Sequence, residues 1–176
     1  MGAADSVGKH VFKTKLEEAI FKATQSKLVP AKFKHERAIV LETWNAHGAA
    51  VVWQELIKRP LASKPLVLFK AMVLVHKLLR EGHPRCVDDL RERLSMLEAL
   101  QSQMQSSSSS ASGFEQLNAA MTSYIINRLK FHALYPEVGQ ELSLQKYQEA
   151  MKGKKRPESK RMCVTAAVDT IAYSFF

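Results

Sequence analysis

Cysteine is scarce in this chain, with Cys86 and Cys163 the only two among 176 residues. Two widely separated cysteines cannot supply the disulfide framework of a small secreted domain, nor a zinc-ligand cluster. The six histidines show no metal-ligand spacing with nearby carboxylates. The sequence therefore predicts no metal site and no cofactor, and a reducing cytosol is the simplest compartment.

A long uninterrupted apolar run is also missing. The most apolar stretch, residues 66–79, is interrupted by Lys70, His76 and Lys77, so it predicts a buried helix rather than a membrane span. The first residues lack the apolar core of a signal peptide. They do fit the pattern for N-myristoylation at Gly2, which is short and has low specificity.

Signatures of catalysis are absent from the sequence as well. It contains no nucleophile elbow, P-loop, dinucleotide-binding glycine pattern or Ser/His/Asp arrangement. Cys86 has no activating base near it in the sequence. His76 lies in the most apolar stretch, which favours a hydrogen-bonded core histidine over a ligand or a catalyst. We therefore predict a binding protein and not an enzyme.

Acidic residues are outnumbered, 17 against 26 Lys and Arg, and the excess is unevenly distributed. Residues 1–40 carry eight Lys or Arg against four Asp or Glu, and residues 151–161 carry six against one. A neutral body with two basic ends favours an anionic partner, either a membrane surface or a nucleic acid. The run 151–161 has no interleaved aromatic residues for base stacking, so its default interpretation is a solvated segment, with a membrane contact as the alternative.

Apolar residues recur at helical spacing, and the body of the chain shows no strand periodicity. The pattern predicts helices over residues 11–23, 32–47, 51–57, 65–81, 85–104, 114–135 and 142–151. The helix 65–81 is apolar nearly all round and is expected to be central. Trp44 and Leu117 are expected to face the core. Short connections predict an all-α fold, an antiparallel helical stack of solenoid type and not a four-helix bundle.

The chain is long enough for one domain with a sizeable core. We expect residues 1–150 to form this domain and residues 151–176 to be a basic C-terminal segment of different character. The serine-rich stretch 106–113 is expected to be a loop within the domain. Residues 164–176 mix Val, Thr, Ile, Tyr and Phe, which fits either a strand or a last helix.

The most specific pattern in the chain is basic. Lys-Ala-Thr at residues 22–24 is followed, after six residues, by Ala-Lys-Phe-Lys-His at residues 31–35, with no acidic residue from 22 to 35. Pro30 marks a helix break, so these groups should converge where the next helix directs its free N–H groups outward. Lysine suits phosphate as a compact, mobile charge. On spacing alone, a solvated basic turn is the alternative.

This arrangement is similar to the phosphoinositide-binding motif of the ANTH domain, the lipid-binding module of clathrin adaptors. Carried over residue by residue, the resemblance implies that Lys22, Lys32, Lys34 and His35 bind the phosphoinositide headgroup. The family usually has Pro, Leu or Val before the second group of charges, where this chain has Ala31.

A second pattern, His-Lys-Leu-Leu-Arg-Glu-Gly-His-Pro at residues 76–84 after Phe69 and Lys70, resembles the huntingtin-interacting-protein-related branch, which includes the yeast Sla-type adaptor. Two motifs in this order are more specific than either alone. The resemblance implies binding to phosphatidylinositol 4,5-bisphosphate on the inner plasma membrane, in clathrin-coated pits and actin patches, with no nucleic-acid partner.

The resemblance further implies that the chain is the N-terminal part of a longer protein. Other regions of that protein would contact clathrin and actin, and an epsin-type ENTH domain would co-assemble around shared lipid. The competing hypothesis is a helical protein-interaction scaffold that binds no lipid, since fold alone does not decide function. The basic cluster favours the lipid hypothesis, because a scaffold has no need for it.

Overall fold

The computed structural model describes residues 12–106 and 113–152, and within these ranges all regular secondary structure is helical. The predicted all-α class is therefore confirmed. The helices are α1 Lys15–Ala23, α2 Phe33–Asn45, α3 Ala50–Leu56, α4 Pro65–Glu81, α5 Cys86–Arg91, α6 Leu94–Ser106, α7 Gly113–Leu134 and α8 Leu144–Met151. The predictions for Gly2, the serine-rich loop and residues 153–176 lie outside the described residues.

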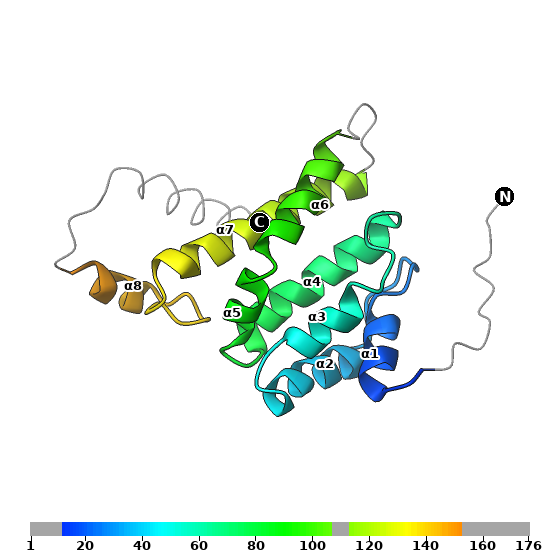
Figure 1. Cartoon of the computed structure of the whole chain (residues 1–176), viewed down its shortest axis with the longest axis horizontal. Coiled ribbons are helices and arrows are strands. Elements are labelled where there is room, and N and C mark those ends of the chain that lie inside the picture. Colours follow the sequence, from blue (N-terminus) through cyan, green and yellow to red (C-terminus); the bar gives the residue numbers. More distant parts are fainter. Residues whose placement is uncertain (1–11, 107–112, 153–176) are drawn as a thin grey trace.

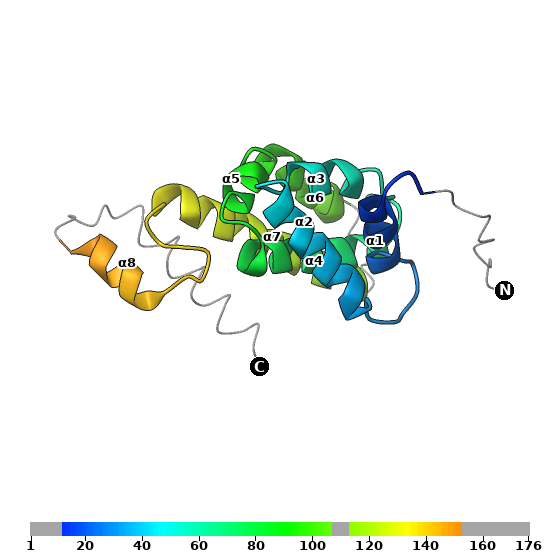
Figure 2. The same cartoon turned by 90° about the horizontal axis from the view of Figure 1, so that it is seen from below.

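Helices α2, α3 and α4 lie one above another, with α1 at one end of them and α5 at the other, and α7 runs alongside α4 (Figure 1). The view from below shows α2 lying over α4, with α8 at the end of the molecule away from α1 (Figure 2). The most extensive packing joins α4 to α7, α1 to α2 and α6 to α7. This arrangement agrees with the predicted helical stack.

Helix α4 is the centre of the main core, as the sequence predicted. It begins with Pro65 at its first turn, where a missing N–H costs nothing. Its buried residues fall on more than one face and pack against α1, α2, α5 and α7. They are Val67, Leu68, Ala71, Met72, Leu74, Val75, Leu78 and Leu79. None of the helices in the described ranges is both long and apolar enough to cross a bilayer.

A smaller, separate apolar cluster holds the other end of the molecule. Its buried members Phe131, Tyr135 and Val138 come from α7 and the segment after it, and Tyr147 of α8 packs against them. The buried Arg128 links this end to α4, because its guanidinium donates hydrogen bonds to the carbonyls of Leu79 at 2.9 Å and Gln140 at 2.7 Å.

Four expectations from the sequence are wrong in detail. Trp44 is 48% exposed, because the buried stripe of α2 runs through Ile39 and Thr43 and leaves Trp44 at its edge, where the indole N–H donates to the Glu81 carbonyl. Leu117 is 51% exposed, and the adjacent Asn118 is buried instead, donating to the Pro65 carbonyl at 2.9 Å.

The predicted helix 85–104 is two helices, α5 and α6. No glycine or proline marks the break. Helix α5 packs on α7 and also on α3 and α4, whereas the main partner of α6 is α7. His76 also differs from expectation, because its buried Nδ1 has no hydrogen-bond partner in the described part of the chain. Its ring packs edge-on against Tyr124, and burial is the main cause lowering the pKa of His76 to about 4.

The end of α4 depends on close packing around Gly82. Its φ of −75° does not require glycine, but a Cβ there would lie 2.6 Å from the Leu78 carbonyl oxygen and 3.1 Å from Thr43 Oγ1. Thr43 Oγ1 itself accepts a hydrogen bond from the His83 N–H at 3.0 Å. Gly82 is therefore required because the backbone of α4 and the side chain of α2 approach too closely for any side chain.

We predict that Gly82→Ala lowers the free energy of unfolding by about 1–3 kcal/mol, since the added methyl group overpacks a backbone contact. Gly113→Ala is the matched control, because a Cβ at Gly113 meets no atom within 4 Å. Urea denaturation of both variants measures the difference. Equal stabilities for the two variants would contradict this account of Gly82.

Candidate anion-binding site

All four residues predicted from the basic pattern lie around one open hollow of about 370 Å³ at the α1 end of the molecule. The hollow is formed by the end of α1, the loop that follows it, the start of α2 and one residue of α4. Its lining residues are Lys22, Gln25, Lys27, Val29, Pro30, Lys32, Lys34, His35 and Lys70. None of these lining residues carries a carboxylate, so the hollow is suited to an anion.

The Lys-Ala-Thr part of the pattern combines one charge with two structural residues. Lys22 lines the hollow, whereas Ala23 and Thr24 are buried. Thr24 Oγ1 donates to the Ile20 carbonyl at 2.7 Å and accepts a hydrogen bond from Arg59 Nε at 2.9 Å. The Arg59 guanidinium also lies 4.4 Å from the centre of the Phe21 ring. These contacts fix the end of α1 and thereby the position of Lys22.

The second part of the pattern forms the first turn of α2. Lys32 is the N-cap residue and its side chain makes no capping hydrogen bond, so it stays available to a ligand. Lys32 and Lys34 are exposed, and His35 is partly buried behind them. A helix N-terminus carries a partial positive charge that adds to that of the side chains. Lysines and helix end together therefore favour phosphate groups in the hollow.

Glu18 is a neighbour of the site that the sequence analysis missed, because it lies outside the acid-free window 22–35. It forms an ion pair with Lys22 one turn along α1. The hydrogen bond and the charge of Lys22 lower the pKa of Glu18, with smaller contributions from His35 and Lys34. Both partners are substantially exposed, and such pairs are weak. A phosphate group can therefore compete with Glu18 for Lys22.

The electrostatics of the hollow act directly on His35. Burial, and then the charges of Lys34 and Lys22, lower the pKa of His35 below its usual 6.5. In the unbound protein these effects favour the neutral imidazole. An anion in the hollow reverses this balance, because an opposite charge close to a histidine favours its protonated form.

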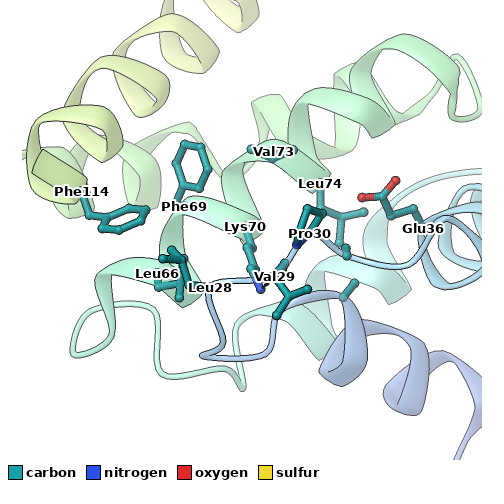
Figure 3. A pocket seen from close by; sticks show the side chains of 12 residues that line it. Leu28, Val29, Pro30, Glu36, Leu66, Phe69, Lys70, Val73, Leu74 and Phe114 are labelled. Carbon is teal, nitrogen blue, oxygen red and sulfur yellow. Dashed lines mark hydrogen bonds between the residues drawn. The ribbon is translucent and has the colours of Figure 1, made fainter.

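Lys70 is the second residue that sequence reasoning missed as part of the site. Its side chain reaches from α4 to the loop that carries Leu28 and Val29 (Figure 3). The ammonium group donates hydrogen bonds to the carbonyls of Gln25 at 2.9 Å, Lys27 at 2.6 Å and Val29 at 2.7 Å. Lys70 therefore fixes the path of the loop between Lys22 and Lys32. The signals in the sequence were that Lys70 interrupts the most apolar stretch and that it precedes the second family pattern.

Two solved structures share this fold. The chain aligns with a structure titled "Structure of the endocytic adaptor complex AENTH" at a TM-score of 0.59 and 28% identity, covering 67% of this chain and 46% of that one. It aligns with the ENTH domain from epsin-2 in complex with phosphatidylinositol 4,5-bisphosphate at a TM-score of 0.65 and 26% identity, covering 71% and 48%. The fold is that of the helical ENTH and ANTH modules of endocytic adaptors.

The ANTH domain model matches residues 15–173, and the chain belongs to the ANTH domain family. The fission-yeast (Schizosaccharomyces pombe) endocytosis protein end4 is 29% identical over 132 residues, 75% of this chain and 12% of that protein. Protein SLA2 of Saccharomyces cerevisiae is 30% identical over 118 residues, covering 67% and 12%. Human huntingtin-interacting protein 1 is 28% identical over 121 residues, covering 67% and 11%. The chain thus spans about one eighth of these relatives, and the predicted branch is confirmed.

We predict that Lys70→Met speeds hydrogen exchange of the amides in residues 25–29 and lowers the free energy of unfolding by about 1–2 kcal/mol. Three carbonyls lose their shared donor, although water replaces part of the interaction. Lys58→Met is the charge-matched control, because Lys58 is 63% exposed and pairs only with the nearby Glu55 in the described contacts. Unchanged exchange of the loop amides in Lys70→Met would show that Lys70 does not hold the loop.

Proposed function

We propose that this domain binds the headgroup of phosphatidylinositol 4,5-bisphosphate and so attaches an endocytic adaptor to the inner plasma membrane. The observation that carries the proposal is the convergence of Lys22, Lys32, Lys34 and His35 on one hollow at the start of α2. Membership of the ANTH family and the similarity to an ENTH domain solved with this lipid support it. The role is binding and not catalysis.

The shape of the hollow indicates how the headgroup is held. The lining residues are lysines, a histidine, a glutamine and two small apolar residues, and no aromatic ring other than the imidazole stands among them. Recognition therefore proceeds through the phosphate groups rather than by stacking on the inositol ring. Lys27, Lys32 and Lys34 are exposed, so at 0.15 M ionic strength salt largely screens their attraction for charges more than about 8 Å away.

A superficial site of this kind gives weak attachment for one domain, and several linked sites bind far more tightly than one. We propose that this chain co-assembles with an epsin-type ENTH domain around shared lipid, at clathrin-coated pits and actin patches. The solved adaptor complex of the same fold supports this proposal. Contacts with clathrin and actin would be made by other regions of a longer protein, as the small share of the relatives that this chain spans suggests.

We predict that the double variant Lys32→Gln with Lys34→Gln weakens binding to vesicles containing phosphatidylinositol 4,5-bisphosphate by about 2 kcal/mol or more, roughly 30-fold. Each lysine near an anionic surface contributes about 1 kcal/mol, and direct phosphate contacts add to this. Co-sedimentation at low and physiological salt measures the loss, and the parent affinity should itself fall steeply with salt.

The control is Lys58→Gln with Lys130→Gln, which removes the same charge from two surface lysines that do not line the hollow. Equal losses in the two double variants would indicate diffuse attraction and not a site. If the parent protein does not bind phosphoinositide vesicles at all, the competing hypothesis of a protein-interaction scaffold is favoured.

We predict that vesicle binding strengthens as the pH falls from 7.5 through the range below 6.5. The pKa of His35 is lowered in the free protein and is raised by bound phosphate, so binding takes up a proton. The contribution of protonated His35 to vesicle binding is fully present below the pKa that His35 has in the free protein. It is lost above the pKa that His35 has in the bound state. Phosphate monoesters titrate near pH 6 themselves, so the measured quantity is the difference between the parent and His35→Gln. Identical pH profiles would remove His35 from the site.

A further inference from the structure

Two of the most exposed large apolar residues lie in the loop that borders the basic hollow, and one of them, Val29, lines it. Leu28 is 78% exposed and Val29 is 60% exposed, and they are consecutive in the loop between α1 and α2. Single exposed apolar residues are common on protein surfaces. A pair at the tip of one loop, directly beside a cluster of lysines, is not explained by the packing of the fold.

The loop tip divides two surfaces of opposite character. Val29 and Pro30 line the basic hollow on one side and an apolar groove of about 460 Å³ on the other. The groove continues the apolar surface of Leu28 across Leu66, Phe69 and Phe114 (Figure 3). A basic face and an apolar face therefore meet along one edge, formed by residues 28–30.

Three backbone polar groups on either side of Leu28 already have internal partners. The carbonyls of Lys27 and Val29 accept from Lys70 Nζ, and the Val29 N–H donates to the Lys27 carbonyl at 2.7 Å. Pro30 has no N–H to satisfy. On a water-exposed surface, water itself can hydrogen-bond to backbone carbonyls, so internal donors are not required there. Where lipid excludes water, an unpaired backbone group is strongly disfavoured. The hydrogen bonds of Lys27 and Val29 therefore lower the free-energy cost of moving this part of the loop out of water.

We propose that Leu28 and Val29 enter the boundary between lipid headgroups and acyl chains when the hollow binds a phosphoinositide. This inference rests on the proposed function and adds a second component to it. The bilayer is the occupant that fits, because Lys27 and Lys32 flank the apolar tip on both sides and match an anionic headgroup layer above an apolar interior. Apolar burial and electrostatic attraction add in such interfacial contacts.

The first experiment separates headgroup recognition from insertion. Leu28→Ser with Val29→Ser should bind soluble inositol 1,4,5-trisphosphate, measured by calorimetry, as the parent does. The same variant should bind phosphatidylcholine vesicles containing phosphatidylinositol 4,5-bisphosphate about tenfold more weakly, because two apolar side chains lose their burial. Leu144→Ser is the control, since Leu144 is 68% exposed on α8, at the end of the molecule away from α1 (Figure 1).

Parent-like vesicle binding by the Leu28→Ser, Val29→Ser variant would overturn the insertion and leave the proposed function intact. Weakening of soluble headgroup binding by the same factor would also overturn it, because the pair would then act on the hollow itself. If the parent bound neither the soluble headgroup nor the vesicles, the proposed function would fail and the insertion with it.

The second experiment reports the surroundings of the tip directly. An environment-sensitive fluorophore on Leu28→Cys, in a Cys163→Ser background, should shift to the blue and brighten on phosphoinositide vesicles but not with the soluble headgroup. Cys86 is buried and stays unlabelled in the folded protein. The emission of the same label on Leu144→Cys should not change on phosphoinositide vesicles.

The proposal would be overturned if the emission of the label at position 28 showed that it remains in water while the protein is bound to vesicles. A blue shift on adding a candidate partner protein in the absence of vesicles would assign the tip to a protein partner instead.

Discussion

The hydrogen bonds from Lys70 to three carbonyls of the α1–α2 loop are the interaction on which the site depends. The motif residues before and after the loop lie at the end of α1 and the start of α2, which pack on each other, and the path of the loop between them completes the hollow. Burial lowers the pKa of Lys70, and the carbonyl partners compensate an ammonium group that is partly removed from water. The central helix, which supplies the core, thereby also sets the shape of the basic hollow.

The same interaction explains why a cluster of like charges is compatible with a stable fold. Mutual repulsion of exposed lysines is weak in water, and the site orders its backbone rather than its charged side chains. Arg59 fixes the end of α1 through Thr24, and Lys70 fixes the loop, while Lys32 and Lys34 stay exposed. The backbone around the hollow is thus held in place by hydrogen bonds, while the exposed lysine side chains can adjust to phosphate groups.

The sequence predicted the fold class, the central role of α4 and the order of the helices. These features depend on local signals, namely apolar periodicity and the Pro and Gly residues at helix ends. The break between α5 and α6 could not be predicted, since no glycine or proline marks it; both helices pack on α7, and α5 packs on α3 and α4 as well. The four motif residues could be predicted from their resemblance to a family, and the structure gathers them around one hollow. Lys70 escaped prediction because its contacts with the loop join residues distant in the sequence. Glu18 pairs with Lys22 one helical turn away, a local contact, and was missed because it lies outside the acid-free window. Headgroup binding by the motif residues, and the domain boundary near residue 150, stay predictions.

The separate apolar cluster around Phe131, Tyr135 and Val138 has a consequence for how the domain responds to force or heat. Few buried side chains hold α8, and they share no member with the main core. Regions with few buried contacts open at lower free energy than the core does. We therefore expect the α8 end to open locally at a lower free energy than the main core, which leaves the lysines carried by that core in place.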